Sequence, residues 1–168
     1  MITHDELMDA MSYSKDDGRF HWKMDRGSMA KAGDELGSWD LYGYKTVRLS
    51  RRSYKLHRLA IFYVTGEWPV GDVDHINGNR SDNRLSNLRA ASRKHNLENR
   101  RHPNPNKPSG LPLGVHATRS ATRYEAKISH NNKSVHLGRF DTPAEASAEY
   151  LRVKTLLHEG YVPEMLSA

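Results

Sequence analysis

The sequence of 168 residues has no cysteine, few hydrophobic residues and no long apolar run. Without cysteine, the chain can form neither disulfides nor a four-cysteine zinc site. No apolar stretch approaches the roughly 18 residues of a membrane-spanning helix. Residues 1–18 are acidic and lack the apolar core of a signal peptide. We therefore expect a soluble cytoplasmic protein that makes no contact with a membrane.

Hydrophobic residues make up only 36% of the chain, which suits one ordinary domain or two small ones with modest cores. Residues 102–112, HPNPNKPSGLP, contain four prolines and a glycine and can form neither a regular helix nor a central strand. Such a segment is typical of an extended linker. We predict an N-terminal domain over 1–101, a linker over 102–112 and a C-terminal domain over 113–168.

Charge is distributed unevenly along the chain. Residues 1–44 carry 5 basic and 9 acidic residues, 45–139 carry 19 and 6, and 140–168 carry 2 and 5, which gives −4, +13 and −3. A strongly basic middle that spans two structured regions favours a polyanion, and nucleic acid is the usual one. The alternative is a solvated surface with scattered cations.

Residues 36–65 predict a small antiparallel sheet followed by a helix. Short strands are expected within 36–41, 44–49 and 53–56, and the apolar stretch 57–65 is expected to form a helix. The sheet carries cations that could contact DNA phosphates without reading bases, namely Lys45, Arg48, Arg51, Arg52 and Lys55.

The stretch 73–100 alternates polar and apolar residues around a strong turn signal. Residues 73–76 read as a strand, Asn77-Gly78 favours a turn, and 88–91 read as a returning strand. A short helix from Arg93 to Arg101 should follow, pressed on the hairpin by Leu97. The predicted order is strand, loop, strand, helix.

In this geometry the residues that could hold a metal meet at one end of the hairpin. Asp74 lies at the end of a strand, and the helix can bring Asn96 opposite it. The carboxylate and amide oxygens of these two residues are ligands that Mg²⁺ prefers. His75 points to the other side of its strand and could take a proton from a water. A base and a cation are the groups that hydrolysis of a phosphodiester needs.

Two structural alternatives apply to this loop. A calcium loop that begins at Asp74 would need an acidic or amide side chain where Ile76 stands and a glutamate where Leu85 stands, so an EF-hand is excluded. Asn79, Asp82 and Asn83 belong to the residue types that usually cap turns, which is the simplest interpretation of all three.

Asp74-His75, Asn87-Leu88 and Asn96 with Asn99 resemble the His-Asn-His (HNH) nuclease motif of phage and intron homing endonucleases, whose fold is the ββα-metal hairpin. The resemblance extends over 57–101. It implies that His75 is the general base and Asn87 braces its loop. It also implies that Asp74 and Asn96 hold one divalent metal, Mg²⁺ or Mn²⁺. His95, beside Asn96, is the alternative helix ligand, because neighbours on a helix point roughly 100° apart.

His57-Arg58 also resembles this nuclease branch, in which a His-Arg-Leu segment leads into the ββα unit. Three interpretations of His57 stay open: a structural histidine, a phosphate contact, or an auxiliary catalytic residue. We include both residues among the candidate DNA contacts.

Residues 113–168 predict three strands and one helix, with Thr142, Pro143 and Glu145 forming the start of the helix. Gly114-Val115, residues 124–128, 137–140 and the helix resemble the Apetala-two DNA-binding domain of plant ethylene-response factors, which phage homing nucleases also carry. The resemblance implies that the sheet enters the major groove of DNA. The candidate contacts are Arg119, Arg123, Tyr124, Lys127, Lys133 and Arg139.

The sequence therefore predicts an α+β chain in which a small antiparallel sheet and a ββα-metal unit are linked to a three-stranded antiparallel sheet with one packed helix. Its expected function is divalent-metal-dependent endonuclease cleavage of double-stranded DNA, by a phage enzyme in the bacterial host cell. With one metal and one base, the protein should nick one strand. We expect it to act as a monomer on DNA and to need no small-molecule cofactor. The alternatives are a catalytically inactive, sequence-specific DNA-binding regulator and an RNA-binding or structural phage protein.

Overall fold

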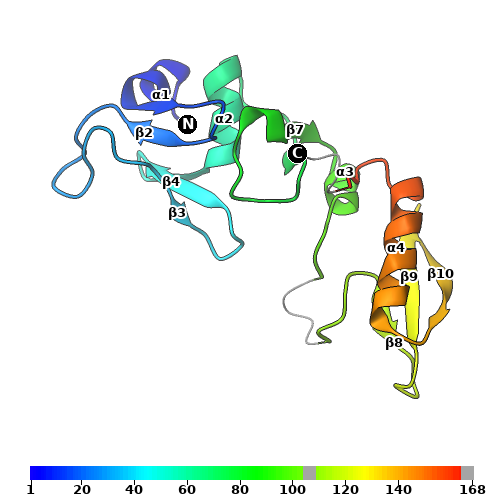
Figure 1. Ribbon diagram of the computed structural model, residues 1–168. Helices are drawn as coiled ribbons and strands as arrows, with labels where there is room; N and C mark the ends of the chain where they lie inside the picture. Colours follow the sequence, from blue (N-terminus) through cyan, green and yellow to red (C-terminus); the bar gives the residue numbers. More distant parts are fainter. Residues whose placement is uncertain (104–108, 164–168) are drawn as a thin grey trace. The chain divides into compact units, whose positions relative to one another are not determined.

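A computed structural model of the chain describes residues 1–103 and 109–163 and shows two compact units, drawn from blue to red in Figure 1. The first unit is Met1–Arg93 and the second begins at Lys94. The division falls before the predicted linker 102–112, of which residues 104–108 lie outside the described residues. The predicted α+β class, with small antiparallel sheets and few helices, is confirmed.

The first unit combines short helices with three small antiparallel sheets. The sheets are β1-β2, β3-β4-β5 and β6-β7. In chain order the elements are α1 (His4–Ala10), β1 (Met11–Tyr13), β2 (Phe20–Trp22), β3 (Ser38–Trp39), β4 (Lys45–Leu49), β5 (Arg52–Lys55), α2 (Leu56–Thr65), β6 (Asp72–His75), a 3-10 turn (Leu85–Asn87) and β7 (Leu88–Ala91).

Local signals explain where several of these elements begin and end. Thr3 and Glu6 form a capping box at the start of α1, which satisfies two otherwise unpaired backbone donors. The β4–β5 hairpin turns at Ser50 and Arg51, both with positive φ, as a two-residue turn between right-twisted strands requires. Gly66, with φ of 73°, ends α2.

One hydrophobic core serves the first unit. Leu7, Phe20 and Leu59 are fully buried in it, and Val73 of β6 and Leu88 of β7 join it from the hairpin. This burial fixes the hairpin's register, in which Asp74 pairs with Arg89 and His75 with Leu88. The predicted order of strand, loop and returning strand agrees with this hairpin.

The helix α3 (Arg93–Glu98) is shorter than predicted, and its environment differs from the prediction. Leu97 is 61% exposed, so the predicted packing of Leu97 on the hairpin is wrong. The buried residues are Glu98 and Asn99, which accept hydrogen bonds from the backbone N–H groups of Gly160 and Val162. A helix with one apolar residue has no hydrophobic face to bury, and polar contacts to the C-terminal segment take its place.

The second unit contains a three-stranded antiparallel sheet with the order β10-β9-β8, and α4 (Pro143–Leu157) packs along it (Figure 1). The strands are β8 (Val115–Ala117), β9 (Tyr124–His130) and β10 (Lys133–Phe140). The predicted capping box of Thr142 and Glu145 is present. The core consists of Val115, Ala126, Ile128, Ala146 and Tyr150.

Among the residues that the structure describes, no helix is both long and apolar enough to cross a membrane.

Candidate active site

His75, the last residue of β6, lies at the centre of the candidate site and is only 3% exposed. Its Nε2 atom is 3.1 Å from Oδ1 of Asn83, which is itself 2% exposed. An amide oxygen only accepts hydrogen bonds, so Nε2 carries the proton and donates it. This leaves Nδ1 as the acceptor atom of the ring, which is the tautomer that a general base needs.

The contact of Asn83 with His75 could not be predicted from the sequence. Asn79 caps a turn as expected, since its Oδ1 accepts from the N–H of Ser81 at 3.0 Å. Asn83 instead points inward to His75, and its backbone oxygen accepts from the Tyr13 hydroxyl at 2.7 Å. The turn-cap interpretation of Asn83 is therefore wrong. In an Asn-rich loop, nothing in the sequence distinguishes the buried asparagine from its exposed neighbours.

Burial lowers the pKa of His75, because a charged imidazole is poorly solvated in the interior. The hydrogen bond to Asn83 and the charges of Asp74 and Asp82 act in the opposite direction. The net direction is downward, so His75 is neutral at neutral pH and can accept a proton.

Asn87 holds the loop that precedes it. Its Oδ1 accepts from the N–H of Asn77 at 2.9 Å, and its Nδ2 donates to the carbonyl of Asp82 at 2.8 Å. The two bonds tie both ends of the loop 77–82 to one buried side chain that is 5% exposed. The Asn87 side chain therefore links the start and the end of this loop.

The acidic residue Asp82 adds a second brace to the same loop. Its carboxylate accepts from Arg84 Nε at 2.8 Å and from Asn77 Nδ2 at 2.7 Å. The hydrogen bond from Arg84 holds the pKa of Asp82 below its usual value, even though burial acts to raise it. The loop is therefore a network of side chains and backbone that keeps Asn83 facing His75.

Asp74 lies on the other face of β6 from His75 and is 6% exposed. Its Oδ2 accepts from Nε and Nη2 of Arg89, at 3.1 and 2.9 Å, directly across the hairpin. A carboxylate suits a hard cation such as Mg²⁺. In this structure the positive charge beside Oδ2 of Asp74 is that of Arg89.

The other predicted ligand, Asn96, lies on α3, which belongs to the second unit apart from its first residue. The alternative ligand, His95, has its Nε2 atom 3.7 Å from Oε2 of Glu159. In the described parts of the chain, no three His, Cys, Asp or Glu side chains gather as a metal-holding group.

His57, the second residue of α2, packs against His75 instead of facing solvent. It is 4% exposed, and its ring lies 5.0 Å from the ring of His75 and 5.1 Å from that of Tyr44. Its Nδ1 atom has no hydrogen-bond partner. Burial, followed by the neighbouring His75, lowers the pKa of His57 to about 3. The predicted DNA contact of His57 conflicts with this burial, and the residue belongs to the interior beside the candidate base.

The other predicted contacts of the first unit fall into two groups. Arg58 donates to the carbonyls of Gly71 and Pro69, at 2.6 and 2.7 Å, and so holds the turn that leads into β6. Lys55 lies over the ring of Tyr44 at 4.0 Å. Lys45 is half-buried and pairs with Glu35. The remaining cations are exposed on the β4–β5 hairpin: Arg48, Arg51 and Arg52.

In the second unit, strand alternation gathers charged side chains on the face of the sheet opposite α4. Ala126 and Ile128 point to the core, so Glu125 and Lys127 point away from it. An irregularity between His136 and Gly138 lets His136 pair with Lys127 and Arg139 pair with Glu125. Without that extra residue the odd spacing of 136 and 139 would place them on opposite faces.

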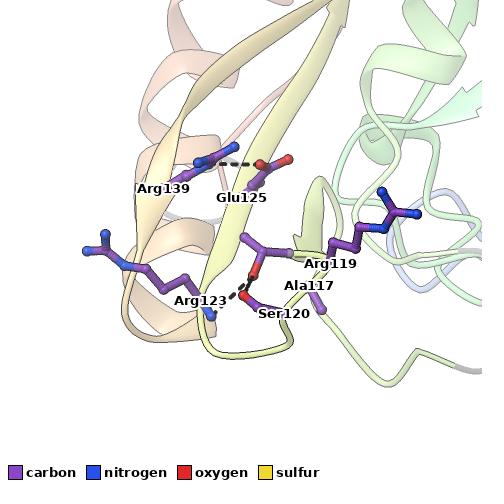
Figure 2. Close-up of a pocket in the computed structure, with 7 residues that line it drawn as sticks. Ala117, Arg119, Ser120, Arg123, Glu125 and Arg139 are labelled. Atoms are coloured by element: carbon purple, nitrogen blue, oxygen red, sulfur yellow. Dashed lines mark hydrogen bonds and ion pairs between the residues drawn. The ribbon is translucent and has the colours of Figure 1, made fainter.

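Glu125 organises this face electrostatically. Its carboxylate contacts Lys127 at 2.7 Å and Arg139 at 3.0 Å, and the hydrogen bond from Lys127 is the main reason that its pKa is lowered. Figure 2 shows Arg139 turned toward Glu125, with Arg119 and Arg123 extending in different directions from the neighbouring turn. These residues line an open groove with a volume of about 480 Å³.

Two further predicted contacts differ in their surroundings. Lys133, at the start of β10, is exposed. Tyr124 alternates onto the same face as Ala126 and packs against the core. The alternation therefore separates Tyr124 from the charged face of Glu125 and Lys127, in contrast to its predicted DNA contact.

Comparison with protein families gives one match, in which residues 54–98 fit the model of the HNH endonuclease family. The matched segment contains α2, the β6–β7 hairpin and α3. No curated protein and no solved structure matches the chain. At the level of the family, this match supports a nuclease, which is a hydrolase that acts on DNA. HNH nucleases generally use a divalent metal ion.

Proposed function

We propose that this protein is a divalent-metal-dependent DNA endonuclease of the homing type, which hydrolyses a phosphodiester and nicks one strand. The observation that carries the proposal is the state of His75. The segment matched to the HNH endonucleases holds this histidine neutral, with Nε2 donating to Asn83 and Nδ1 as the acceptor.

The chain's own residues account for handling the proton. Nδ1 of His75 takes a proton from the attacking water, and the hydrogen bond to Asn83 keeps the ring in the tautomer that can do so. Asn87 holds the loop that carries Asn83 through its bonds to Asn77 and Asp82. Because the ring meets His57 edge-on and lies tilted beside Tyr44, its orientation is set before DNA arrives.

The metal would be held by Asp74 and Asn96, and Mg²⁺ or Mn²⁺ suits their oxygen donors. When bound, the ion supplies positive charge for the leaving oxygen. Asn96 is preferred to His95 as the helix ligand, because the spacing of Asn96 and Asn99 resembles the motif. Arg89 pairs with Asp74, which makes a buried carboxylate tolerable.

DNA binding is divided between the two units in this proposal. The exposed cations Arg48, Arg51 and Arg52 contact phosphates, and the face that carries Lys127 and Arg139 acts as an Apetala-two-like major-groove surface. The homing type and the phage or intron origin rest on the resemblance of the motif. One base and one metal per chain imply a monomer that nicks.

The test is nicking of supercoiled plasmid with Mg²⁺ or Mn²⁺, comparing wild type, His75→Ala and the control Asn79→Ala, with DNA binding recorded in parallel. The control removes an exposed turn cap from the same loop without touching His75. We expect metal-dependent nicking by wild type and the control, and loss of nicking by His75→Ala with DNA binding retained.

Two results would overturn the proposal. DNA binding without nicking in either metal would point to the regulator, and equal competition by RNA at fixed salt would point to an RNA-binding protein. If His75→Ala still nicks DNA, the protein is a nuclease but His75 is not its general base.

A further inference from the structure

We propose that the tip of the β3–β4 hairpin, Leu41 and Tyr42, is a DNA-distorting wedge that inserts between base pairs next to the phosphodiester that is cut. This inference rests on the proposed function and adds to it a contact with the stacked bases themselves. The argument follows from the exposure of the tip, its rigidity, its attachment to the candidate site and its charged surroundings.

The tip exposes large apolar side chains at positions where turns usually carry small polar ones. Leu41 is 100% exposed, Tyr42 is 72% exposed and Trp39 is 57% exposed. Single exposed apolar residues are common, but here three lie within four positions. Residues i+1 and i+2 of a turn are usually Asn, Asp, Gly or Pro, and none of these types stands at 41 or 42.

The turn is held rigidly although its side chains are exposed. The Asp40 carboxylate accepts from the N–H groups of Tyr42 and Tyr44, both at 2.9 Å. Asp40 N–H donates to the Tyr44 carbonyl at 2.8 Å, and Gly43, with φ of 79°, closes the turn on the Asp40 carbonyl at 3.1 Å. A preorganised tip loses little conformational entropy on insertion, as a wedge requires.

The turn is also fastened to the candidate active site. Arg80, on the loop that Asn87 braces, donates from Nη1 to the Tyr42 carbonyl at 2.6 Å. Tyr44, two residues after Tyr42, has its ring 6.0 Å from the ring of His75. The wedge and the candidate base are therefore parts of one packed assembly, and DNA that reaches His75 meets the tip at the same time.

The charges around the tip identify its ligand as an anion with apolar faces. Arg80 and Lys55 lie over the ring of Tyr44, at 4.9 and 4.0 Å, and Lys45 lies 5.4 Å from the ring of Trp39. Two acids lie in the same region: the Asp40 carboxylate accepts from backbone N–H groups, and Glu35 pairs with Lys45. Arg80 and Lys55 are therefore the cations that the tip offers to a ligand. Cations beside exposed aromatic and aliphatic side chains match duplex DNA, whose phosphates flank stacked bases.

A wedge at this place has a direct mechanical use. Pushing Leu41 between two base pairs unstacks them and bends the duplex. The bend turns the backbone beside the unstacked step toward the protein. Since His75 is only 3% exposed, a straight duplex reaches it poorly, and a distorted one brings its phosphodiester closer.

The experiment uses the full-length protein and the duplex around a nick mapped on plasmid. A fluorescent adenine analogue, whose emission rises when it unstacks, replaces adenines one at a time across that site. Binding is measured in the His75→Ala background so that the duplex stays intact. The variant is Leu41→Ser with Tyr42→Ser, and the matched control is Val70→Ser, since Val70 is 94% exposed in the same unit.

We expect the unmutated tip and the Val70→Ser control to raise emission at one step beside the nick, and the double variant to abolish that rise. The double variant should bind about tenfold more weakly, because stacking contacts are lost. The slope of log affinity against log salt should stay unchanged, because no phosphate contact is removed. In the background with His75 intact, the double variant should nick more slowly.

The outcomes separate the wedge from the proposed function. If the chain binds and nicks but no adenine analogue brightens, or if the double variant brightens it equally, the wedge is wrong and the nuclease stands. If the double variant changes only concentration-dependent self-association in sedimentation, the tip contacts a second copy instead. If wild type neither binds nor nicks DNA, both proposals fall.

Discussion

At the scale of single residues, the candidate site consists of buried polar groups that control one imidazole. His75 has Asn83 on its Nε2 side and the rings of His57 and Tyr44 against its plane. Both histidines have lowered pKa values, chiefly because burial disfavours the charged ring. The interior thus keeps two neutral histidines together, which at full charge would repel each other.

Asn83→Ala tests how the orientation of His75 contributes to nicking. The hydrogen bond that His75 donates to Asn83 raises the pKa of His75 against the effect of burial, so its loss should move the acidic limb of the pH–rate profile to lower pH. Loss of one hydrogen bond worth about 1 kcal/mol should slow nicking roughly fivefold. Asn79→Ala serves as the control, and an unmoved acidic limb in Asn83→Ala would contradict the role.

Because His57 is buried with a lowered pKa, we expect the first unit to lose stability as the pH falls. Its folded pKa is about 3 and its ordinary value is 6.5, so between these values the unfolded chain binds a proton that the folded chain does not. The contribution of His57 to stability is therefore present above pH 6.5 and is lost as pH falls toward 3. The free energy of unfolding should fall by about 1.4 kcal/mol per pH unit in that window.

The measurement is urea unfolding at a series of pH values, followed by tryptophan fluorescence. All three tryptophans, Trp22, Trp39 and Trp68, lie in the first unit, so the signal reports on that unit alone. His57→Gln, which stays neutral, should reduce the slope by about one proton. A variant with the wild-type slope would show that His57 is not the group that titrates.

At the scale of elements, α3 is bound to the C-terminal segment of its own unit. Lys154 of α4 is 1% exposed and donates to the carbonyl of Arg100, with its ammonium 4.3 Å from the ring of Tyr161. Glu98 accepts from the N–H of Gly160 at 3.0 Å. The helix that carries Asn96 is therefore held by residues 154–162, far from it in sequence.

Gly160→Ala tests this attachment. A Cβ at position 160 would lie 2.6 Å from the Cα of His95, so α3 or the segment must shift. We expect the second unit to lose about 1–3 kcal/mol of stability. Hydrogen exchange of the β9 amides should become faster in proportion.

The control is Gly110→Ala, which adds the same methyl group where no atom lies within 4 Å. Gly110 has φ of 62°, so this control bears the ordinary strain of about 1 kcal/mol for a side chain in that region. If Gly160→Ala costs no more than the control, the close approach of the segment to α3 does not stabilise the unit.

At the scale of the whole molecule, the basic residues belong to both units. The first unit exposes Arg48, Arg51 and Arg52, and the second exposes Arg119, Lys133 and Arg139. Each cation that neutralises a phosphate releases counterions, so the salt dependence of DNA affinity counts the contacts. Two units that bind one duplex together should both contribute to this count.

Two triple variants test simultaneous binding. Replacing Arg48, Arg51 and Arg52 by alanine, or Arg119, Lys133 and Arg139 by alanine, should each lower the slope of log affinity against log salt by roughly 0.9 per lost contact. The slope is measured on the same duplex for wild type and both variants. A variant whose slope equals that of wild type would remove its group of cations from the DNA interface.

The sequence by itself determined most of the helices, strands and turns. The capping box at Thr142, the apolar alternation of the strands and the turn at Asn77-Gly78 act between near neighbours, so a local pattern suffices to predict them. The same holds for Asp74 and His75, whose opposite directions follow from strand alternation.

Only the tertiary structure decided which polar groups are buried and against what. Asn83 meets His75 because the loop between them is braced, His57 is enclosed because α2 packs beside Tyr44, and α3 is held by Gly160 and Lys154. Each outcome depends on contacts between residues far apart in the chain. A polar side chain prefers water, and it is buried only where such contacts give it partners.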